Sequence, residues 1–257
     1  MNVEGPISKP NSSEELGPLR GQVWLTLQTR QARQLVRGRN GTGGKQPIIG
    51  LGLFADWLRV IWQAARADDP YADWRLIKVD EAIADRDALL QRLQRALDEQ
   101  LAQMGSIEVA VAASEHPYRM PLRFANPYAY QAARLVSKYD ALVCAALTAC
   151  HIGMLDGAAR RQVIELGGRK IRSLFILPQG YRFLRIDRAG ILKGGGKSAQ
   201  AVQTMGVVPG DVLSGERRAP LAPQRRRLLS GFSEKIGLHP SASAADAAIP
   251  AAGNDDA

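Results

Sequence analysis

The segment LGLFADWLRVIWQAAR (51–66) is the strongest structural signal in the chain. Its apolar residues recur three or four positions apart, the spacing that gathers side chains on one face of an α-helix. A stripe this broad predicts a helix buried against a core, so the fold is expected to be built around helices. The residues of the stripe are Leu53, Phe54, Trp57, Leu58, Ile61, Trp62 and Ala65.

Helical patterns continue towards the C-terminus. Residues 71–104 carry a narrow seam of leucines and Ile83 with charged residues elsewhere. Asn126–Pro127 is typical of a helix start, because asparagine caps helices well and proline is favoured in the first turn. The expected helices are 71–104 as one helix or two, 126–154, 156–175 with a weakening or break at Gly167–Gly168, and a last glycine-interrupted helix before Gly206.

Strand signals are fewer. QVWLTLQ (22–28) alternates, so we expect a strand with Val23, Leu25 and Leu27 inward and Gln22, Trp24, Thr26 and Gln28 outward. Residues 107–124 indicate a second extended region, interrupted by Pro117 and Pro121, and 181–186 a short strand. The predicted fold class is therefore α+β and predominantly helical. A short helix over 30–39 is expected between the first strand and 51–66.

Composition shifts divide the chain into four parts. Residues 1–19 and 216–257 hold too few apolar residues to offset the entropy of ordering, which predicts flexible tails, the second one basic and then alanine-rich. Between them we expect a DNA-binding element over 20–70 and a larger helix-rich body over 71–215.

Charge points to a polyanionic partner. The 257 residues include 34 basic and 25 acidic side chains, a net charge of +9, and 26 of the basic residues are arginine. Arginine presents a planar set of donors that suits phosphate.

The two cysteines lie about 9 Å apart along one expected helix, too far for a disulfide. The most apolar window, 141–155, is shorter than the ~20 residues that span a bilayer. No signal peptide is visible, so we expect a cytoplasmic protein without a membrane segment.

One stretch near the N-terminus is basic and free of acidic residues: residues 16–55 contain six basic and no acidic side chains. Threonine and glutamine can bond base edges, while arginine and lysine can hold phosphates. A solvated basic face without a partner remains the alternative, although the outward Trp24 favours an interface. The predicted DNA-binding residues are Thr26, Gln28, Arg30, Arg33, Arg37, Arg39 and Lys45.

Other candidate sites are weaker. GGGKS (194–198) lacks the glycine spacing of a phosphate-binding loop, and the three histidines are far apart in sequence. The basic run 160–197 is better explained as the solvated side of amphipathic helices, and the arginines after 216 as a basic arm. We therefore expect no catalytic residue, cofactor, metal or small-molecule substrate.

Several strings resemble a known family. They are GPLRGQVWLTLQTRQARQLVRGRNGTGGKQPIIGLGLFADWLRVIWQAARADDPYADW (17–74), PYRMPLRFANPYAYQAARLVSKYDAL (117–142), QGYRF (179–183) and GERRAPLAP (215–223). The chain resembles the integrating conjugative element proteins of proteobacterial genomic islands, which are related to AcaB-type transcriptional regulators.

The resemblance implies a DNA-binding regulator with a ribbon-helix-helix-like reading element. In that arrangement two chains pair their strands into an antiparallel ribbon that lies in the major groove. The ribbon would map to 22–28 and the helices to 30–39 and 51–66, with Thr26, Gln28 and Arg30 facing the bases. The larger C-terminal part would dimerise or contact partners.

The function predicted from these observations is transcriptional regulation of an integrating conjugative element by a homodimer bound to double-stranded DNA. An alternative is a non-catalytic partition or maintenance accessory protein that binds DNA non-specifically or meets an acidic protein. An enzyme of DNA transfer is least favoured, because the sequence shows no cluster of metal ligands.

Overall fold

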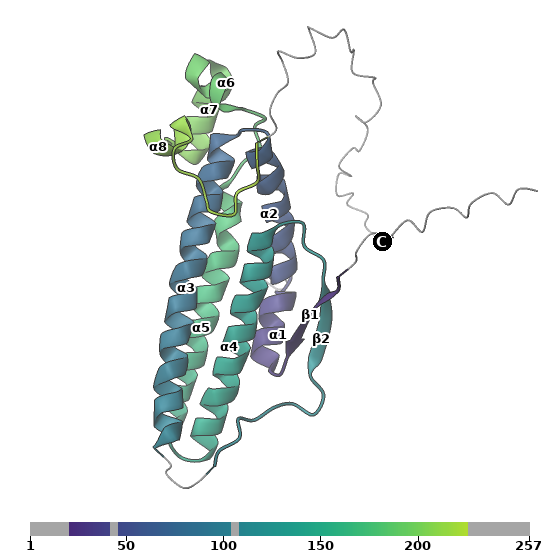
Figure 1. The fold of residues 1–257 in the computed structure, drawn as a ribbon, viewed down its shortest axis with the longest axis vertical. Helices are drawn as coiled ribbons and strands as arrows, with labels where there is room; N and C mark the ends of the chain where they lie inside the picture. Colours follow the sequence, from purple (N-terminus) through teal and green to yellow (C-terminus); the bar gives the residue numbers. More distant parts are fainter. Residues whose placement is uncertain (1–20, 42–45, 104–107, 226–257) are drawn as a thin grey trace, which may run out of the picture.

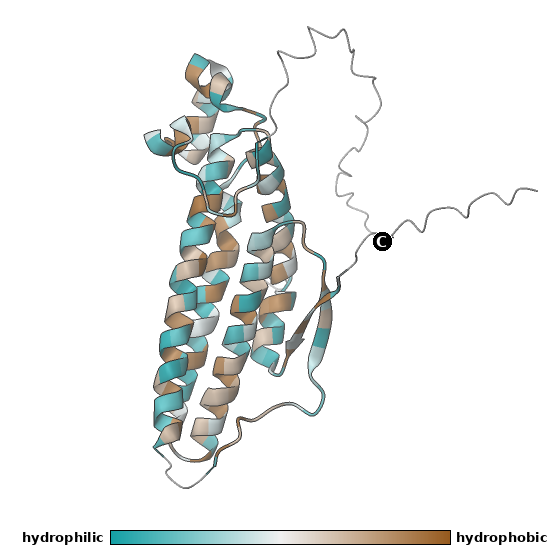
Figure 2. Ribbon diagram, viewed as in Figure 1, coloured by the Kyte–Doolittle hydropathy of each residue, from teal (hydrophilic) through white to brown (hydrophobic). Residues whose placement is uncertain are grey.

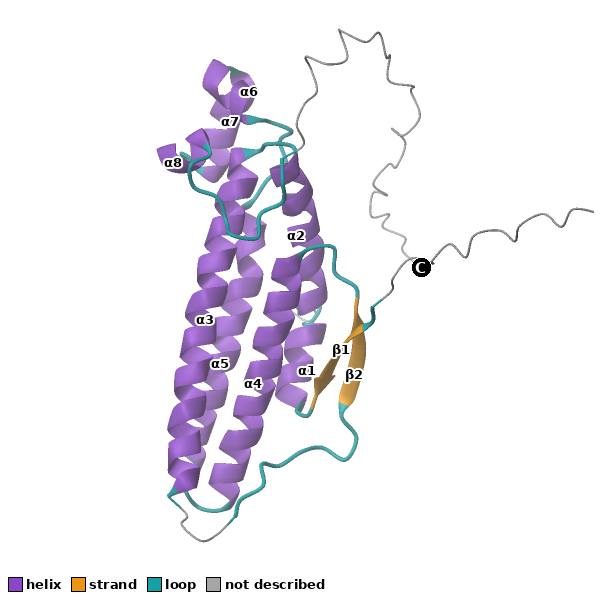
Figure 3. Ribbon diagram, viewed as in Figure 1, coloured by secondary structure: helices purple, strands orange, loops and turns teal. Residues whose placement is uncertain are grey.

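The computed structural model describes residues 21–41, 46–103 and 108–225 and is predominantly helical with one small sheet, which confirms the predicted fold class (Figure 3). The predicted tail 1–19, Lys45 and residues 226–257 lie outside the described residues. The elements are β1 (Val23–Leu27), α1 (Arg30–Arg37), α2 (Leu51–Arg66), α3 (Pro70–Ala102), β2 (Tyr118–Leu122), α4 (Pro127–His151), α5 (Gly157–Ile176), η1 (Leu177–Gly180), α6 (Arg188–Lys193), α7 (Gly196–Met205) and α8 (Gly210–Ser214).

Short-range capping signals set where the long helices begin. The Asp69 carboxylate accepts from the backbone N–H groups of Tyr71 and Ala72 at the start of α3, and Asn126 caps α4 in the same way. Such caps satisfy N–H groups that have no partner inside the helix. The helix or two helices predicted over 71–104 are one helix within the described residues, since the 33 residues of α3 run without a break for about 50 Å.

Helices α2 to α5 lie side by side along the length of the molecule (Figure 1). Asp87 of α3 pairs with Lys138 of α4, and Arg86 of α3 donates to Ser173 near the end of α5. Together with the chain directions in Figure 1, these contacts place α3 parallel to α4 and antiparallel to α5. Two parallel neighbours need a connection that returns along the bundle, and β2 forms on that return.

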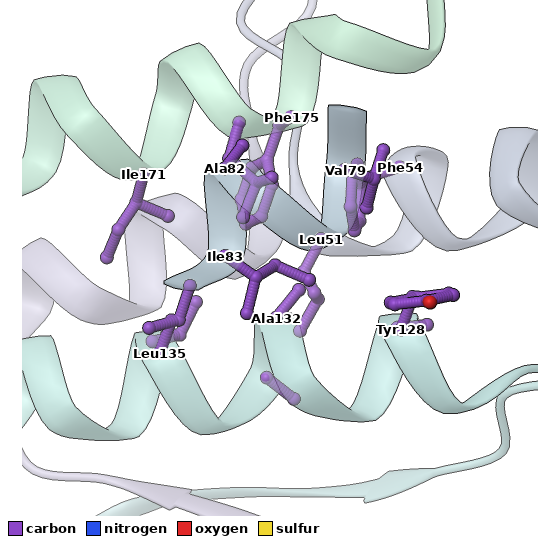
Figure 4. Close-up of a cluster of buried hydrophobic side chains, with 14 of the residues drawn as sticks. Leu51, Phe54, Val79, Ala82, Ile83, Tyr128, Ala132, Leu135, Ile171 and Phe175 are labelled. Carbon is purple, nitrogen blue, oxygen red and sulfur yellow. The ribbon is translucent and has the colours of Figure 1, made fainter. Parts of the chain in front are cut away.

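One core joins all the main elements, as Figure 4 shows for part of it. The Phe54 ring of α2 lies 5.0 Å from the Phe175 ring of α5, and Tyr128 of α4 is fully buried. Hydrophobic and hydrophilic residues alternate along each long helix, as expected for helices with one buried side (Figure 2). The predicted DNA-binding element, 20–70, therefore packs directly on the helix-rich body through Leu27, Leu35 and α2.

The predicted break at Gly167–Gly168 is wrong, because α5 continues through both glycines. The Tyr139 ring of α4 packs against them, and a Cβ at Gly167 would lie 2.8 Å from that ring. The Tyr139 hydroxyl donates to the Ile164 carbonyl oxygen at 3.0 Å, while burial raises the pKa of Tyr139 to about 12. The glycines thus let α4 and α5 approach closely.

Gly167→Ala is expected to lower the free energy of unfolding by about 1–3 kcal/mol, because the added methyl group overpacks the Tyr139 contact. The measurement is urea unfolding followed by circular dichroism. Gly52→Ala is the matched control, since Gly52 is also helical but has open space beside it. There the gain in helix propensity should stabilise by about 0.5–1 kcal/mol. Equal stabilisation by both changes would contradict the close approach.

Segment 181–186 is not a strand, contrary to the sequence prediction, and the only sheet among the described residues is formed by β1 and β2. Tyr181 is instead buried, and its hydroxyl donates to Asp69 at 2.6 Å. Burial and the neighbouring Asp69 carboxylate raise the pKa of Tyr181, so the phenol stays a donor. The segment is held by this contact at the start of α3 rather than by a neighbouring strand.

Arginine and aspartate side chains fasten the C-terminal part to the start of α3. Asp73 is fully buried and accepts from Arg188 at 2.6 Å and from Arg218 at 2.9 and 3.0 Å. Arg188 also pairs with Asp68, and Arg225 pairs with Asp68 at 2.9 Å. We call these five residues the Arg–Asp cluster. Residues 216–225, expected in the flexible tail, are therefore placed against the body.

Candidate nucleic-acid interface

Asp140 of α4 positions the junction between β1 and α1. This carboxylate is only 4% exposed and accepts from the backbone N–H of Gln28 at 2.6 Å and of Thr29 at 2.9 Å. It also accepts from the Thr29 hydroxyl at 2.6 Å, and the same hydroxyl oxygen caps α1 by accepting from Ala32. The bundle thereby fixes where the strand ends and the helix begins.

The Asp140 contacts also determine which groups of α1 can bind a phosphate. The Asp140 carboxylate already occupies donors at the start of α1, and its negative charge opposes an anion there. A phosphate is thus better held by the arginine side chains of α1 than by its N-terminal N–H groups.

Both strands of the ribbon come from one chain. β1 and β2 pair antiparallel, with Thr26 opposite Arg119 and Trp24 opposite Pro121. Directly opposite residues project to the same side of a sheet, so these four side chains share one surface, which we call the ribbon face. All four are exposed, and Trp24 keeps 47% of its surface open. The ribbon lies on the flank of the bundle beside α1 and α4 (Figure 1).

The predicted sidedness of β1 is confirmed, although its first residue is not covered by the core. Leu25 and Leu27 are buried, whereas Trp24 and Thr26 are exposed. Val23 lies on the same side as these leucines, opposite the buried Leu122, although 48% of its surface is exposed. It begins the strand, at the end away from the Asp140 contact.

The structure also corrects the source of the second strand. The resemblance implied a ribbon formed by two chains, but here β2 occupies one edge of β1. Gln28 is half-buried, and its side-chain oxygen accepts from the Ser114 backbone N–H at 3.0 Å. Its amide nitrogen is the group left to contact a ligand.

Two of the predicted arginines, Arg33 and Arg37, lie beside one end of the ribbon. The guanidinium carbons of Arg33 and Arg37 lie 5.1 and 5.9 Å from the centre of the Tyr118 ring, which is within the range of cation–π attraction. Arg30 is exposed at the start of α1, and Arg39 is exposed beyond its end, where it donates to the Gln46 carbonyl oxygen. The side chains of Arg33 and Arg37 thus contact the ribbon at Tyr118, while Thr26 lies on the ribbon face.

These arginines differ from those of the C-terminal part. Within the described ranges, the ion pairs include none that neutralises Arg30, Arg33, Arg37, Arg39 or Arg119. The C-terminal arginines were predicted to form a basic arm, yet Arg217, Arg218 and Arg225 all pair with carboxylates. Positive charge without an ion-pair partner is therefore present at the ribbon end, where anions would be attracted. Other described cations, among them Arg160 and Arg161 of α5, also have no ion-pair partner.

Sequence reasoning missed Arg119. Its outward position depends on which strand pairs with β1, and the alternation of residues 107–124 was weak. Its guanidinium carbon lies 5.3 Å from the centre of the Trp24 ring across the two strands. The exposed Trp24 was the available signal, since an open aromatic ring often has a partner.

Two remaining features concern other kinds of site. No group of three or more metal-ligating side chains occurs among the residues that the structure describes. No helix in the described part of the chain is both long and apolar enough to cross a membrane.

Fold and surface together define a helical bundle that carries a two-stranded basic ribbon on its flank. The sequence profile of the family "Transcriptional regulator AcaB" matches residues 15–226, so the chain belongs to the AcaB family of transcriptional regulators. A crystal structure of selenomethionine-containing AcaB from uropathogenic E. coli is similar, with a TM-score of 0.52 and 16% identity. The similarity covers 76% of this chain and 95% of that one, and at this identity it concerns the fold alone. The search of curated proteins gives no match.

Proposed function

We propose that this chain is a cytoplasmic DNA-binding regulator that controls transcription of an integrating conjugative element and performs no catalysis. The observation that carries the proposal is the exposed two-stranded ribbon flanked by arginines that lack carboxylate partners among the described residues. The major groove of DNA admits a two-stranded ribbon of this kind.

Two kinds of contact follow from the positions of the side chains. Thr26 on the ribbon face and the Gln28 amide meet base edges, since both offer hydrogen-bonding groups at the outer surface. Arg30, Arg33 and Arg37 beside the ribbon hold the phosphates and fix its orientation. We propose that Arg39 and Lys45 contact further phosphates of the same DNA.

We propose further that the chain acts on DNA as a homodimer. The sheet has two strands among the described residues, so β1 keeps one edge without a strand partner. Pro121 removes an N–H donor from β2 and leaves its outer edge less suited to another strand. The edge of β1 is thus the better place for the strand of a second copy.

Fluorescence anisotropy with promoter fragments neighbouring the gene, measured across salt, tests the proposal. The parent chain should bind a promoter fragment more tightly than random duplex, with a steep salt dependence. Arg30→Ala combined with Arg33→Ala should weaken binding about 10–100-fold and lower the salt slope by about 2, because each lost phosphate contact contributes about 0.9.

The control is Arg92→Ala combined with Arg161→Ala, which removes the same charge from exposed positions on α3 and α5, two helices that do not carry the ribbon. It should leave affinity nearly unchanged. Equal weakening by both pairs would indicate a diffuse charge effect and no ribbon interface. Equal affinity of the parent for every sequence would instead favour the maintenance accessory protein.

A further inference from the structure

Register across the ribbon places an arginine beside the residue predicted to contact bases. Thr26 and Arg119 are directly opposite, and both are exposed on the ribbon face. The other side of the ribbon is committed to the core, where Leu25, Leu27 and Leu122 are buried. Only the ribbon face is therefore available to enter a groove.

The Arg119 side chain is held in place before any ligand binds. Its guanidinium lies over the Trp24 ring, and no carboxylate of the described residues pairs with it. Stacking on an aromatic ring restrains the plane of the guanidinium, which lowers the entropy lost on binding. Its donors remain free, since stacking uses the face of the group and hydrogen bonds use its edge.

The chemistry of these donors suits one base. Arginine forms two parallel hydrogen bonds with O6 and N7 of guanine, and both atoms lie at the edge of the major groove. The arginines of α1 are placed differently, because they flank the ribbon at Tyr118 and not on its face. They would meet phosphates at one edge of the groove, which carry no sequence information.

We propose that Arg119, positioned by the Trp24 ring, reads a guanine in the major groove and is the main specificity-determining residue of the ribbon. This inference rests on the proposed function. It assigns the sequence preference to the second strand, which lies outside the N-terminal element that carries the other predicted contacts.

Selection of bound duplexes from a random DNA library tests the inference directly. The full-length parent should enrich a motif that contains an invariant guanine. Arg119→Ala should lose the preference at that position and bind the selected duplex about 10–100-fold more weakly, while its affinity for random duplex falls less than about threefold. Arg119→Lys keeps the charge but not the paired donors, so it should also lose the guanine.

Arg37→Ala is the matched control from the flank of the ribbon. It should weaken binding to selected and random duplexes alike and retain the motif. Thermal unfolding of each variant verifies that it is folded, as expected for exposed positions.

The outcomes separate the two proposals. A parent chain that binds no DNA refutes the proposed function and this inference with it. A parent chain that selects a motif, with Arg119→Ala selecting the same motif, overturns this inference alone. A parent chain that binds DNA without selecting any motif also overturns it. So does an Arg119→Ala variant whose affinity falls equally for selected and random duplexes.

Discussion

Replacing Asp73 with leucine is expected to lower the free energy of unfolding by about 3–5 kcal/mol. Asp73 is fully buried and accepts hydrogen bonds from both Arg188 and Arg218. Removing one member of a buried ionic cluster leaves the other charges without compensation in a poorly solvated place. Arg188 is the more affected, since its side chain is only 8% exposed. Urea unfolding followed by circular dichroism gives the value.

Glu81→Gln is the control for this loss. Glu81 pairs with Arg217 in an ion pair whose side chains are more than half exposed, and such pairs contribute about 1 kcal/mol or less. If Glu81→Gln changes the free energy of unfolding little and Asp73→Leu lowers it strongly, burial of the Asp73 ion pairs is the cause of the larger loss. If Asp73→Leu unfolded at the same urea concentration as the parent, the Arg–Asp cluster would not hold the C-terminal part to α3.

Asp140→Ala is expected to lower the free energy of unfolding by about 3 kcal/mol and to weaken DNA binding at the same time. The change removes the acceptor for two backbone N–H groups and the Thr29 hydroxyl, and unsatisfied groups at such a site each cost about 1–3 kcal/mol. It also releases the turn that orients α1 against the ribbon. Unfolding and anisotropy on the same samples measure both effects.

An ordinary helix cap provides the comparison for Asp140. Asp156 caps α5 by accepting from Ala159, is exposed, and lies in the turn between α4 and α5, where it makes no hydrogen bond to the β1–α1 junction. Asp156→Ala should cost about 1 kcal/mol and leave DNA binding unchanged. Equal losses of stability at the two positions, or unchanged DNA binding by a folded Asp140→Ala chain, would contradict the positioning role.

Local signals predicted most of the helical framework. Residues 51–66 show their buried stripe in the sequence, and Asn126–Pro127 marks the start of α4, because both features depend on neighbours within a few positions. Gly167–Gly168 was misinterpreted because glycine weakens an isolated helix. What stabilises α5 at that point is the Tyr139 ring from another helix, which no local pattern reveals.

In the candidate site, too, the residues placed by local pattern were predicted and those placed by long-range pairing were not. Alternation alone placed Trp24 and Thr26 on an outer face, and the structure agrees. Arg119 could not be placed beside Thr26, because strand register is set by long-range pairing and a slip of one residue reverses every side chain. Arg218 and Arg225 were misassigned for a similar reason, since Asp73 and Asp68, with which they pair, lie far away in the sequence.

The ribbon face lies against duplex DNA if the chain binds as proposed. Photocrosslinking measures that contact most directly, with p-benzoylphenylalanine placed at Thr26 in one sample and at Gln162, an exposed position on α5, in another. With a promoter duplex bound, we predict crosslinks to DNA from position 26 and none from position 162. Crosslinks from position 162 alone, while the chain is bound to the duplex, would contradict the account.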